Sequence, residues 1–553
     1  MITWQGDWWK EILGSLNKRL DITYLIFHFC GSSGLAPPMI SLRTDPGDLE
    51  IKPPRKAATQ FHAIMFKNPP QKVQRRKPLT ARVGLLAVGH HTYWLQFDGL
   101  LDEMHRKVAD LKRRLDGNAV EVVEFGMLDS AQSAYDAVPK IKAANLDMLF
   151  IDMATYATSS TFGTICREVD VPIVLVAIQP LAAMDYPNGS TFMQLCNDDF
   201  CSISEFIGVA IRLGRRAPEL VLGHEVGDPS VDSDLAMWCQ IAKVLHDLKT
   251  ARLGLMGHVL EAMLDMHADP TAVTAAFGSH IVLVEPDDAF KHYRDADPAK
   301  IEEWKTRILD FFDTPTPVSD PITEKLKESD LEVASRAAVA LEAFIEEKKL
   351  DGLAYYYEAE AGSEMRTMVT NFIVGNSLLT GAGFPMCGEY DIKTCVAMMI
   401  MDRLDIGGSF AEFHPVDFAL DSVLVGHDGP HHINIAAAKP VIRSLKKYHG
   451  KPGSGAGVEF QIKEGPITML SIGQTAHGKF KFVIAEGESA NRPIPPTGNT
   501  NTHGIFKPDV RTFLKKWVKE GPTHHFALGI GHHAQELVHI AEILGIESVV
   551  VTP

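Results

Sequence analysis

Apolar strand-like segments alternate with helical segments from Ala81 onward, and this alternation constrains the fold more than any other feature of the chain. Residues 81–89 (ARVGLLAVG) have the pattern of a buried strand, residues 97–117 carry apolar side chains at the three-to-four spacing of a helix, and residues 119–125 (AVEVVEF) have the pattern of a second strand. Strands joined by helical crossovers are parallel, and the helices cover both faces of their sheet. The pattern predicts a doubly wound, Rossmann-like α/β domain over residues 81–219.

The same alternation continues from residue 220, where the strand-like run ELVLGHEVG leads into a long helical segment, and it lasts to residue 405. It predicts a second α/β domain with a parallel sheet over residues 220–405. After Asp405 the pattern changes to short strands separated by Gly and Pro, such as GVEFQIKEG and KFKFVIAEGES. Such segments are typical of antiparallel sheets, so we expect a C-terminal β-barrel-like domain over residues 406–553.

Residues 1–80 differ from the rest of the chain. They contain three tryptophans, several prolines, a short apolar patch and the basic run 71–77 (QKVQRRK). No positively charged region precedes the apolar patch, so the order of a signal peptide is missing. We expect residues 1–80 to be an N-terminal extension that is partly disordered, with the basic run as a solvated linker.

The composition excludes several classes of partner. The net charge is -16, whereas binding to nucleic acid or to an anionic membrane needs a concentrated basic face, so we expect neither partner. The longest apolar stretches have the length of strands and are too short to cross a bilayer. Seven cysteines without a CxxC pair indicate the reduced thiols of a cytoplasmic protein rather than a disulfide framework.

Two carboxylates and one imidazole lie close behind glycines in the C-terminal half of the chain: Glu389, Glu412 and His427. A fourth donor is expected from the pair His532–His533, which follows the strand-like run FALGI, because α/β folds place ligands at strand ends. Two carboxylates and two imidazoles would form one site for a divalent metal ion. Taken singly, each is more commonly a surface or capping residue, so the prediction depends on the set. Other histidines of the region are expected to be structural, namely His431, His432 and His503.

Four motifs follow one another in the order GAGFPMCGEYDIKT, GGSFAEF, VGHD and GIGHHAQE. In this order they resemble the L-arabinose isomerase family, within the L-arabinose/L-fucose isomerase superfamily, over roughly residues 81–553. The resemblance implies two α/β domains followed by a β-barrel domain, assembled as trimers or hexamers. It implies the metal ligands Glu389, Glu412, His427 and His533. Asp391 and Lys393 match the first motif and are expected to support Glu389.

The residue types suit an aldose–ketose isomerase, which moves a proton between C1 and C2 of a free sugar through a cis-enediol(ate). A divalent cation offsets the charge that develops on O1 and O2, and a mixed set of oxygen and nitrogen donors suits Mn²⁺, with Co²⁺ or Mg²⁺ as alternatives. Glu389 and Glu412 are also the expected acid and base. The sequence leaves open which of them abstracts the proton.

Polar side chains at strand ends of the first α/β domain are expected to bind the sugar. His91 and Tyr93 follow the first strand, Gln179 ends a later one, and His532 adjoins the fourth expected ligand. The single glycine of GHHTYW is too few for a dinucleotide-binding loop. The resemblance implies that His91 and Tyr93 complete the pocket of a neighbouring subunit, so the expected partners are a sugar and further copies of this chain.

Apolar residues stand where the family carries polar sugar contacts, at Leu175 and Ala177, so the substrate need not be L-arabinose. A sugar epimerase or another carbohydrate enzyme on the same metal site is one alternative, because epimerisation shares the first proton abstraction. A non-catalytic sugar-binding paralogue is the other. Such a paralogue is expected to lose a ligand, and all four expected ligands are present.

Overall fold

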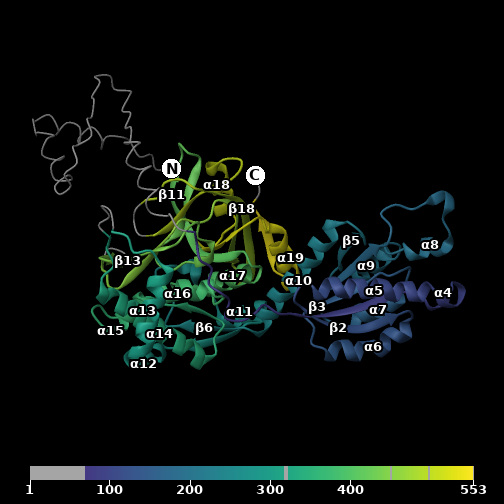
Figure 1. The fold of residues 1–553 in the computed structure, drawn as a ribbon, viewed down its shortest axis with the longest axis horizontal. Coiled ribbons are helices and arrows are strands. Elements are labelled where there is room, and N and C mark those ends of the chain that lie inside the picture. The colour runs from purple at the N-terminus through teal and green to yellow at the C-terminus, as the bar shows by residue number, and fades with distance from the viewer. Residues whose placement is uncertain (1–68, 317–321, 449–450, 496–498, 552–553) are drawn as a thin grey trace, which may run out of the picture. The chain divides into compact units, whose positions relative to one another are not determined.

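The computed structural model describes residues 69–316, 322–448, 451–495 and 499–551 (Figure 1). Their three largest sheets are a five-stranded and a four-stranded parallel sheet, followed along the chain by a closed antiparallel barrel. This confirms the predicted fold class of two doubly wound sheets and a C-terminal barrel. Among the described residues, no helix is both long and apolar enough to cross a membrane.

The first sheet has the order β2–β1–β3–β4–β5, and all neighbouring strands are parallel. Its central strands are buried almost throughout, as expected for parallel strands covered on both faces. The strands are β1 (Arg82–Val88), β2 (Glu121–Leu128), β3 (Met148–Asp152), β4 (Ile173–Gln179) and β5 (Glu219–His224). The helices are α4 (His91–Gln96), α5 (Leu100–Asp116), α6 (Ala131–Ala143), α7 (Ser159–Glu168), α8 (Thr191–Cys196) and α9 (Ile203–Arg212).

Strand β5 belongs to the first sheet, whereas the predicted domain boundary assigned its residues to the second domain. We expected residue 220 to open the second domain, but β5 pairs in parallel with β4 and completes the first sheet. The chain leaves this sheet through α10 (Pro229–Thr250), which starts at the N-cap Asp228. Alternation of strands and helices fixes the order of the elements, but it does not fix which sheet each strand joins.

The second sheet has the order β10–β9–β6–β7 and is also parallel. Its strands are β6 (Arg252–Met256), β7 (His280–Val284), β9 (Gly352–Tyr355) and β10 (Met386–Cys387). The helices of this region are α11 (Pro270–Phe277), α12 (Pro286–Arg294), α13 (Pro298–Phe311), α14 (Glu328–Lys348), α15 (Glu364–Thr370) and α16 (Phe372–Gly381). A small antiparallel sheet joins β8 (Thr323–Glu324) to β13 (Val441–Leu445) and β16 (Ala456–Glu459).

The barrel closes because β17 pairs with β18 over ten residue pairs, after the ring has passed through β20, β11, β12 and β19. All six pairings around this ring are antiparallel. The strands are β11 (Gly407–Asp417), β12 (Ser422–His427), β17 (Gly465–Gln474), β18 (Phe480–Ala490), β19 (Thr500–Ile505) and β20 (Phe526–Ile530). Strand β21 (Glu547–Val550) adds to β18 in parallel, and the helices are α18 (Val510–Lys519) and α19 (Ala534–Leu544).

Helix α17 (Ile392–Arg403) connects the second sheet to the barrel, and every one of its residues is buried. It packs against α10, β9 and the barrel strands β11, β17 and β20. A helix that is enclosed on all sides is apolar all round, which is why its sequence shows no amphipathic stripe. Its two ends are therefore fixed points inside the protein, and both carry charged side chains.

The predicted extension 1–80 is described only from residue 69, and residues 1–68 lie outside the described part. The described remainder is in contact with the folded chain: Val73 bonds to Asn434, Arg75 to Asp402 and Lys77 to Asp351. Part of the basic run that we expected to be a solvated linker is therefore held against the protein by ion pairs.

Candidate metal centre

Glu389 lies in a tight turn between β10 and α17. Glu389 and Tyr390 have φ of 61° and 62°, a left-handed conformation that costs an ordinary residue about 1–2 kcal/mol. Two hydrogen bonds hold the turn, from Tyr390 N to Tyr355 O at 3.0 Å and from Thr394 N to Asp391 Oδ1 at 3.1 Å. The side chain of Glu389 is buried near the N-terminal end of α17. Backbone strain kept at a buried carboxylate is typical of a functional site.

Three neighbouring barrel strands bring a second carboxylate and two imidazoles to the same place. Glu412 of β11 pairs with the residue before His427 on β12. On the other side of β11, Ala411 pairs with the first residue of β20, and His525 directly precedes that strand. Neighbouring strands lie roughly 5 Å apart, so the side chains of Glu412, His427 and His525 fall within reach of one another.

The ligand atoms of the four side chains converge. His427 Nε2 lies 3.9 Å from Glu389 Oε1 and 3.9 Å from Glu412 Oε1. His525 Nε2 lies 3.5 Å from Glu389 Oε2. Ligands bound at about 2.1 Å to one ion stand roughly 3–4 Å from each other, so the spacing fits a single divalent cation. His524 also has a ring nitrogen within 4.8 Å of the ligand atoms of Glu389 and His525.

The imidazoles of His427 and His525 are each held through Nδ1, the ring nitrogen that faces away from Glu389 and Glu412. His525 Nδ1–H donates to Asp391 Oδ2 at 3.1 Å, and His427 Nδ1–H donates to Asp428 O at 2.7 Å. These partners assign the tautomers and leave Nε2 as the acceptor in both rings. His525 Nε2 is buried without a hydrogen-bond partner among the described residues. A carboxylate–histidine pair with an open Nε2 is how proteins orient a metal ligand, so the donor set fits a cation.

Burial and neighbouring charges set the pKa of these groups. Burial lowers the pKa of His427 well below its usual value, and the nearby His525 lowers it further. Burial also disfavours the charged form of His525, but the hydrogen bond to Asp391 and the surrounding carboxylates outweigh this and raise its pKa. The buried thiol of Cys387 has a pKa well above its usual value and stays protonated. The metal donors of this group are therefore oxygen and nitrogen.

Comparison with known proteins finds similarity to sugar isomerases. A family model described as L-fucose isomerase, C-terminal domain, matches residues 414–551, which include His427 and His525. The L-arabinose isomerase of Nocardioides sp. is 24% identical over 356 residues, 63% of this chain and 68% of that protein. The L-arabinose isomerase of Cellvibrio japonicus is 22% identical over 487 residues, 85% of this chain and 93% of that protein. The chain is thus distantly similar to L-arabinose isomerases over much of its length.

The chain is also similar to an enzyme named for a different sugar. The sulfoquinovose isomerase of Alkalicoccus urumqiensis is 21% identical over 322 residues, 57% of this chain and 68% of that protein. The relatives thus include isomerases named for two chemically distinct sugars.

His533, expected from sequence as the fourth ligand, is not brought to the group. It precedes α19, and its Nδ1 lies 2.8 Å from Glu536 Oε1. Residues 526–531 separate the two histidine pairs, and the five residues of β20 alone, at about 3.3 Å each, span roughly 17 Å. His532 lies at the same far end, where Nε2–H donates to Gly487 O at 3.2 Å. The structure places His525 where we expected His533.

The reason is the direction of β20. We placed ligands at the end of the strand, as in parallel sheets, but in an antiparallel barrel alternate strands begin at the rim where their neighbours end. The sequence THHFALGIGHH carries a histidine pair at each end of this strand, and the signal that would have selected His524–His525 is the antiparallel pairing of β20 with the strand that carries Glu412.

Asp391 and Lys393, expected to support Glu389, do so indirectly. Asp391 caps α17 and holds His525. The buried Lys393 Nζ donates to Asp265 O at 2.5 Å, and Asp265 Oδ2 in turn contacts His524 Nδ1 at 2.7 Å. Both residues therefore act on the histidine pair before β20.

The predicted sugar contacts of the first domain form a cluster of their own. The rings of His90, His91, Tyr93 and Tyr156 lie together, with His90 centroids 5.2 Å from His91 and 5.2 Å from Tyr93. Gln179 is not free to point outward, because its Nε2 donates to Leu181 O at 2.5 Å. The structure thus gathers polar rings at the end of β1, separate from the four candidate ligands.

Proposed function

We propose that the protein is a metal-dependent aldose–ketose isomerase that acts on a free sugar through a cis-enediol(ate). The observation that carries the proposal is the convergence of Glu389, Glu412, His427 and His525, with Asp391 orienting the last of them. The names of the relatives, L-arabinose isomerase and sulfoquinovose isomerase, support the same reaction class.

The proposed cofactor is Mn²⁺, with Co²⁺ or Mg²⁺ as alternatives, because two carboxylates and two imidazoles suit these ions better than a closed thiolate site. Glu389, Glu412, His427 and His525 would hold the ion. When bound, it supplies a positive charge that stabilises the developing enediolate oxygens.

The protein's own groups supply the proton transfers. In this proposal one of the carboxylates, Glu389 or Glu412, removes the proton from the sugar carbon, and the other returns a proton to the neighbouring position. Neutral His427 and Asp391-bound His525 keep their Nε2 lone pairs directed at the site. Phe410 packs against both rings, with its centroid 4.3 Å from each, and keeps water away from that side.

The test is product analysis by NMR, with Mn²⁺ present and a panel of pentoses, hexoses and a sulfonated hexose. A ketose product supports isomerisation. An aldose product with inverted C2 identifies an epimerase instead, and sugar binding without turnover identifies a non-catalytic paralogue. We expect Glu389→Gln to lose about 10³-fold in turnover, because it removes both a ligand and a proton carrier. The control Glu536→Gln changes the partner of His533 and is expected to keep wild-type turnover.

We further propose a homo-oligomer, a trimer or hexamer, in which the ring cluster near His91 and Tyr93 meets the metal centre of a neighbouring copy. Apolar side chains stand exposed in the same domain, with Leu95 91% and Tyr186 85% exposed. Exposed apolar residues beside polar rings are typical of an interaction surface.

A further inference from the structure

Residues 73–77, which we call the strap, contact the loop that carries His427. Val73 N donates to Asn434 Oδ1 at 2.8 Å, and Asn434 Nδ2 donates back to Val73 O at 3.1 Å. Asn434 lies in the short helix η3 (Ile433–Ile435), seven residues after His427. The strap therefore bonds to the far end of this loop through both groups of one amide.

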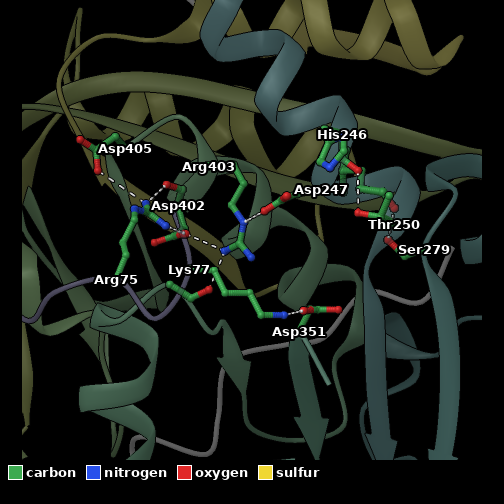
Figure 2. Close-up of polar contacts among 12 residues, drawn as sticks. Arg75, Lys77, His246, Asp247, Thr250, Ser279, Asp351, Asp402, Arg403 and Asp405 are labelled. Carbon is green, nitrogen blue, oxygen red and sulfur yellow. Dashed lines mark hydrogen bonds and ion pairs between the residues drawn. The ribbon is translucent and has the colours of Figure 1, made fainter. Parts of the chain in front are cut away.

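Arg75 makes the second strap contact, with the C-terminal end of α17 (Figure 2). Its guanidinium donates to Asp402 Oδ2 at 2.7 Å and to Asp402 O at 2.5 Å. The same buried carboxylate accepts from Arg403 Nη1 at 2.6 Å and from His432 Nε2 at 3.2 Å. A buried carboxylate is costly unless its oxygens are satisfied, so each of the three donors matters to the geometry of Asp402.

His432 and His431 extend these contacts to the metal centre. His432 N donates to Ser409 Oγ at 3.2 Å, and Ser409 Oγ donates to His431 Nδ1 at 3.0 Å. His431 Nε2–H then donates to His427 O at 2.8 Å. Ser409 and both histidines are buried, so a broken contact is not replaced by water. A continuous series of hydrogen bonds thus joins Arg75 to the backbone of a candidate ligand.

We propose that the strap holds the loop His427–Ile435 in place and that Arg75 is a positioning residue for the metal centre. Arg75 acts through Asp402 and His432, while Val73 fixes the opposite end of the same loop. The inference rests on the proposed function in one respect, namely that a metal ion is what the loop is positioned to bind.

Lys77 offers a matched control within the strap. Its Nζ lies 2.8 Å from Asp351 Oδ1, but its side chain is 77% exposed, against 24% for Arg75. Figure 2 shows this ion pair between Lys77 and Asp351. Asp351 also accepts a hydrogen bond from Arg252 N at the start of β6, so the Lys77 contact connects the strap to the second sheet. An exposed pair of this kind contributes at most about 1 kcal/mol.

The experiment compares wild type, Arg75→Met and Lys77→Met in the full chain by two measurements. The first is hydrogen exchange by mass spectrometry of the metal-free protein, read on peptides that cover residues 427–435. The second is the Kd for Mn²⁺ from calorimetry. We expect Arg75→Met to speed exchange in this loop and to raise the Kd about 10-fold, a typical effect of losing an outer contact to a ligand. Lys77→Met is expected to match wild type in both.

Equal exchange and equal Kd in Arg75→Met and Lys77→Met would overturn the proposal. Should Arg75→Met fail to fold, Asn434→Ala tests the Val73 contact on the same loop, with the same expected changes. Arg75→Lys, which keeps the charge, is expected to recover part of the lost protection. If wild type binds no Mn²⁺, the proposed function fails, and the exchange measurement alone then decides whether the strap holds the loop.

Discussion

At the scale of single residues, the environment of an imidazole says more about its role than its motif does. His525 is buried, donates through Nδ1 to Asp391 and faces Glu389 with Nε2. His533 instead stands at the start of α19 with Glu536 as its partner. The side chain of His533 makes no cap hydrogen bond to α19, whereas an imidazole placed among carboxylates, such as His525, is suited to bind a cation.

This contrast predicts opposite results for two alanine variants. His525→Ala removes one of four donors and is expected to weaken Mn²⁺ binding by more than about 100-fold. His533→Ala is expected to leave the Kd within about twofold and to lower stability slightly, because it removes the contact to Glu536. Calorimetric titration with Mn²⁺ measures both. Loss of binding in His533→Ala with retention in His525→Ala would restore the assignment made from the sequence motif.

At the scale of elements, periodicity predicts whether a segment is a helix or a strand better than it predicts which sheet a strand joins. The alternation from Ala81 onward correctly indicated two parallel sheets, and the change to short strands after Asp405 correctly indicated the barrel. It did not show that β5 completes the first sheet, because neighbouring strands of one sheet are chosen by packing of distant segments. The periodicity also did not show the direction of β20. It therefore did not show whether His525 or His533 joins the candidate metal centre. Gly407 and Gly408, which precede Glu412 on β11, were informative because a φ of 104° at each of them favours glycine.

Helix α17 gives an element-scale prediction on pH. Burial alone would raise the pKa of Asp402, but the hydrogen bond from His432 and the charges of Arg403 and Arg75 lower it well below its usual value. A carboxyl with a depressed folded-state pKa contributes stability that is present above its unfolded pKa of about 3.9 and is lost as pH falls through the folded value. At neutral pH, Asp402→Asn is expected to cost about 3–5 kcal/mol.

The measurement is the urea unfolding midpoint of wild type and Asp402→Asn between neutral pH and the acid limit of reversible unfolding. The difference in urea midpoint between wild type and Asp402→Asn should be largest at neutral pH. It should become smaller as the solution becomes acidic below about pH 4. Asp405→Asn is the control, because Asp405 faces Arg75 at 3.5 Å from the same end of α17 but is 80% exposed. A difference in urea midpoint between wild type and Asp402→Asn that stays constant down to acid pH would contradict the charge assigned to Asp402.

At the scale of the whole molecule, the order of four motifs along the chain indicated the resemblance to L-arabinose isomerases, whereas the sequence did not indicate the substrate. The relatives named L-arabinose isomerase are only 22–24% identical to this chain. Sugar choice depends on the shape of a pocket wall, and the rings expected from the first domain gather in a cluster of their own at the end of β1. A pocket built from two copies would explain why each copy carries only part of it.

Mixing two inactive variants tests this arrangement. Glu389→Gln disables the metal centre, and the double variant His91→Ala, Tyr93→Ala disables the ring cluster at the end of β1. Suppose that each site combines the metal centre of one copy with the rings of another. In a random equal mixture, about half of the metal centres and about half of the ring clusters are unmutated. About a quarter of the sites then contain both unmutated parts. Unfolding and refolding the two variants together should therefore restore about a quarter of wild-type turnover, while each alone stays inactive. Activity that stays at the level of the separate variants, with subunit exchange verified by mass spectrometry, would place the whole site within one copy.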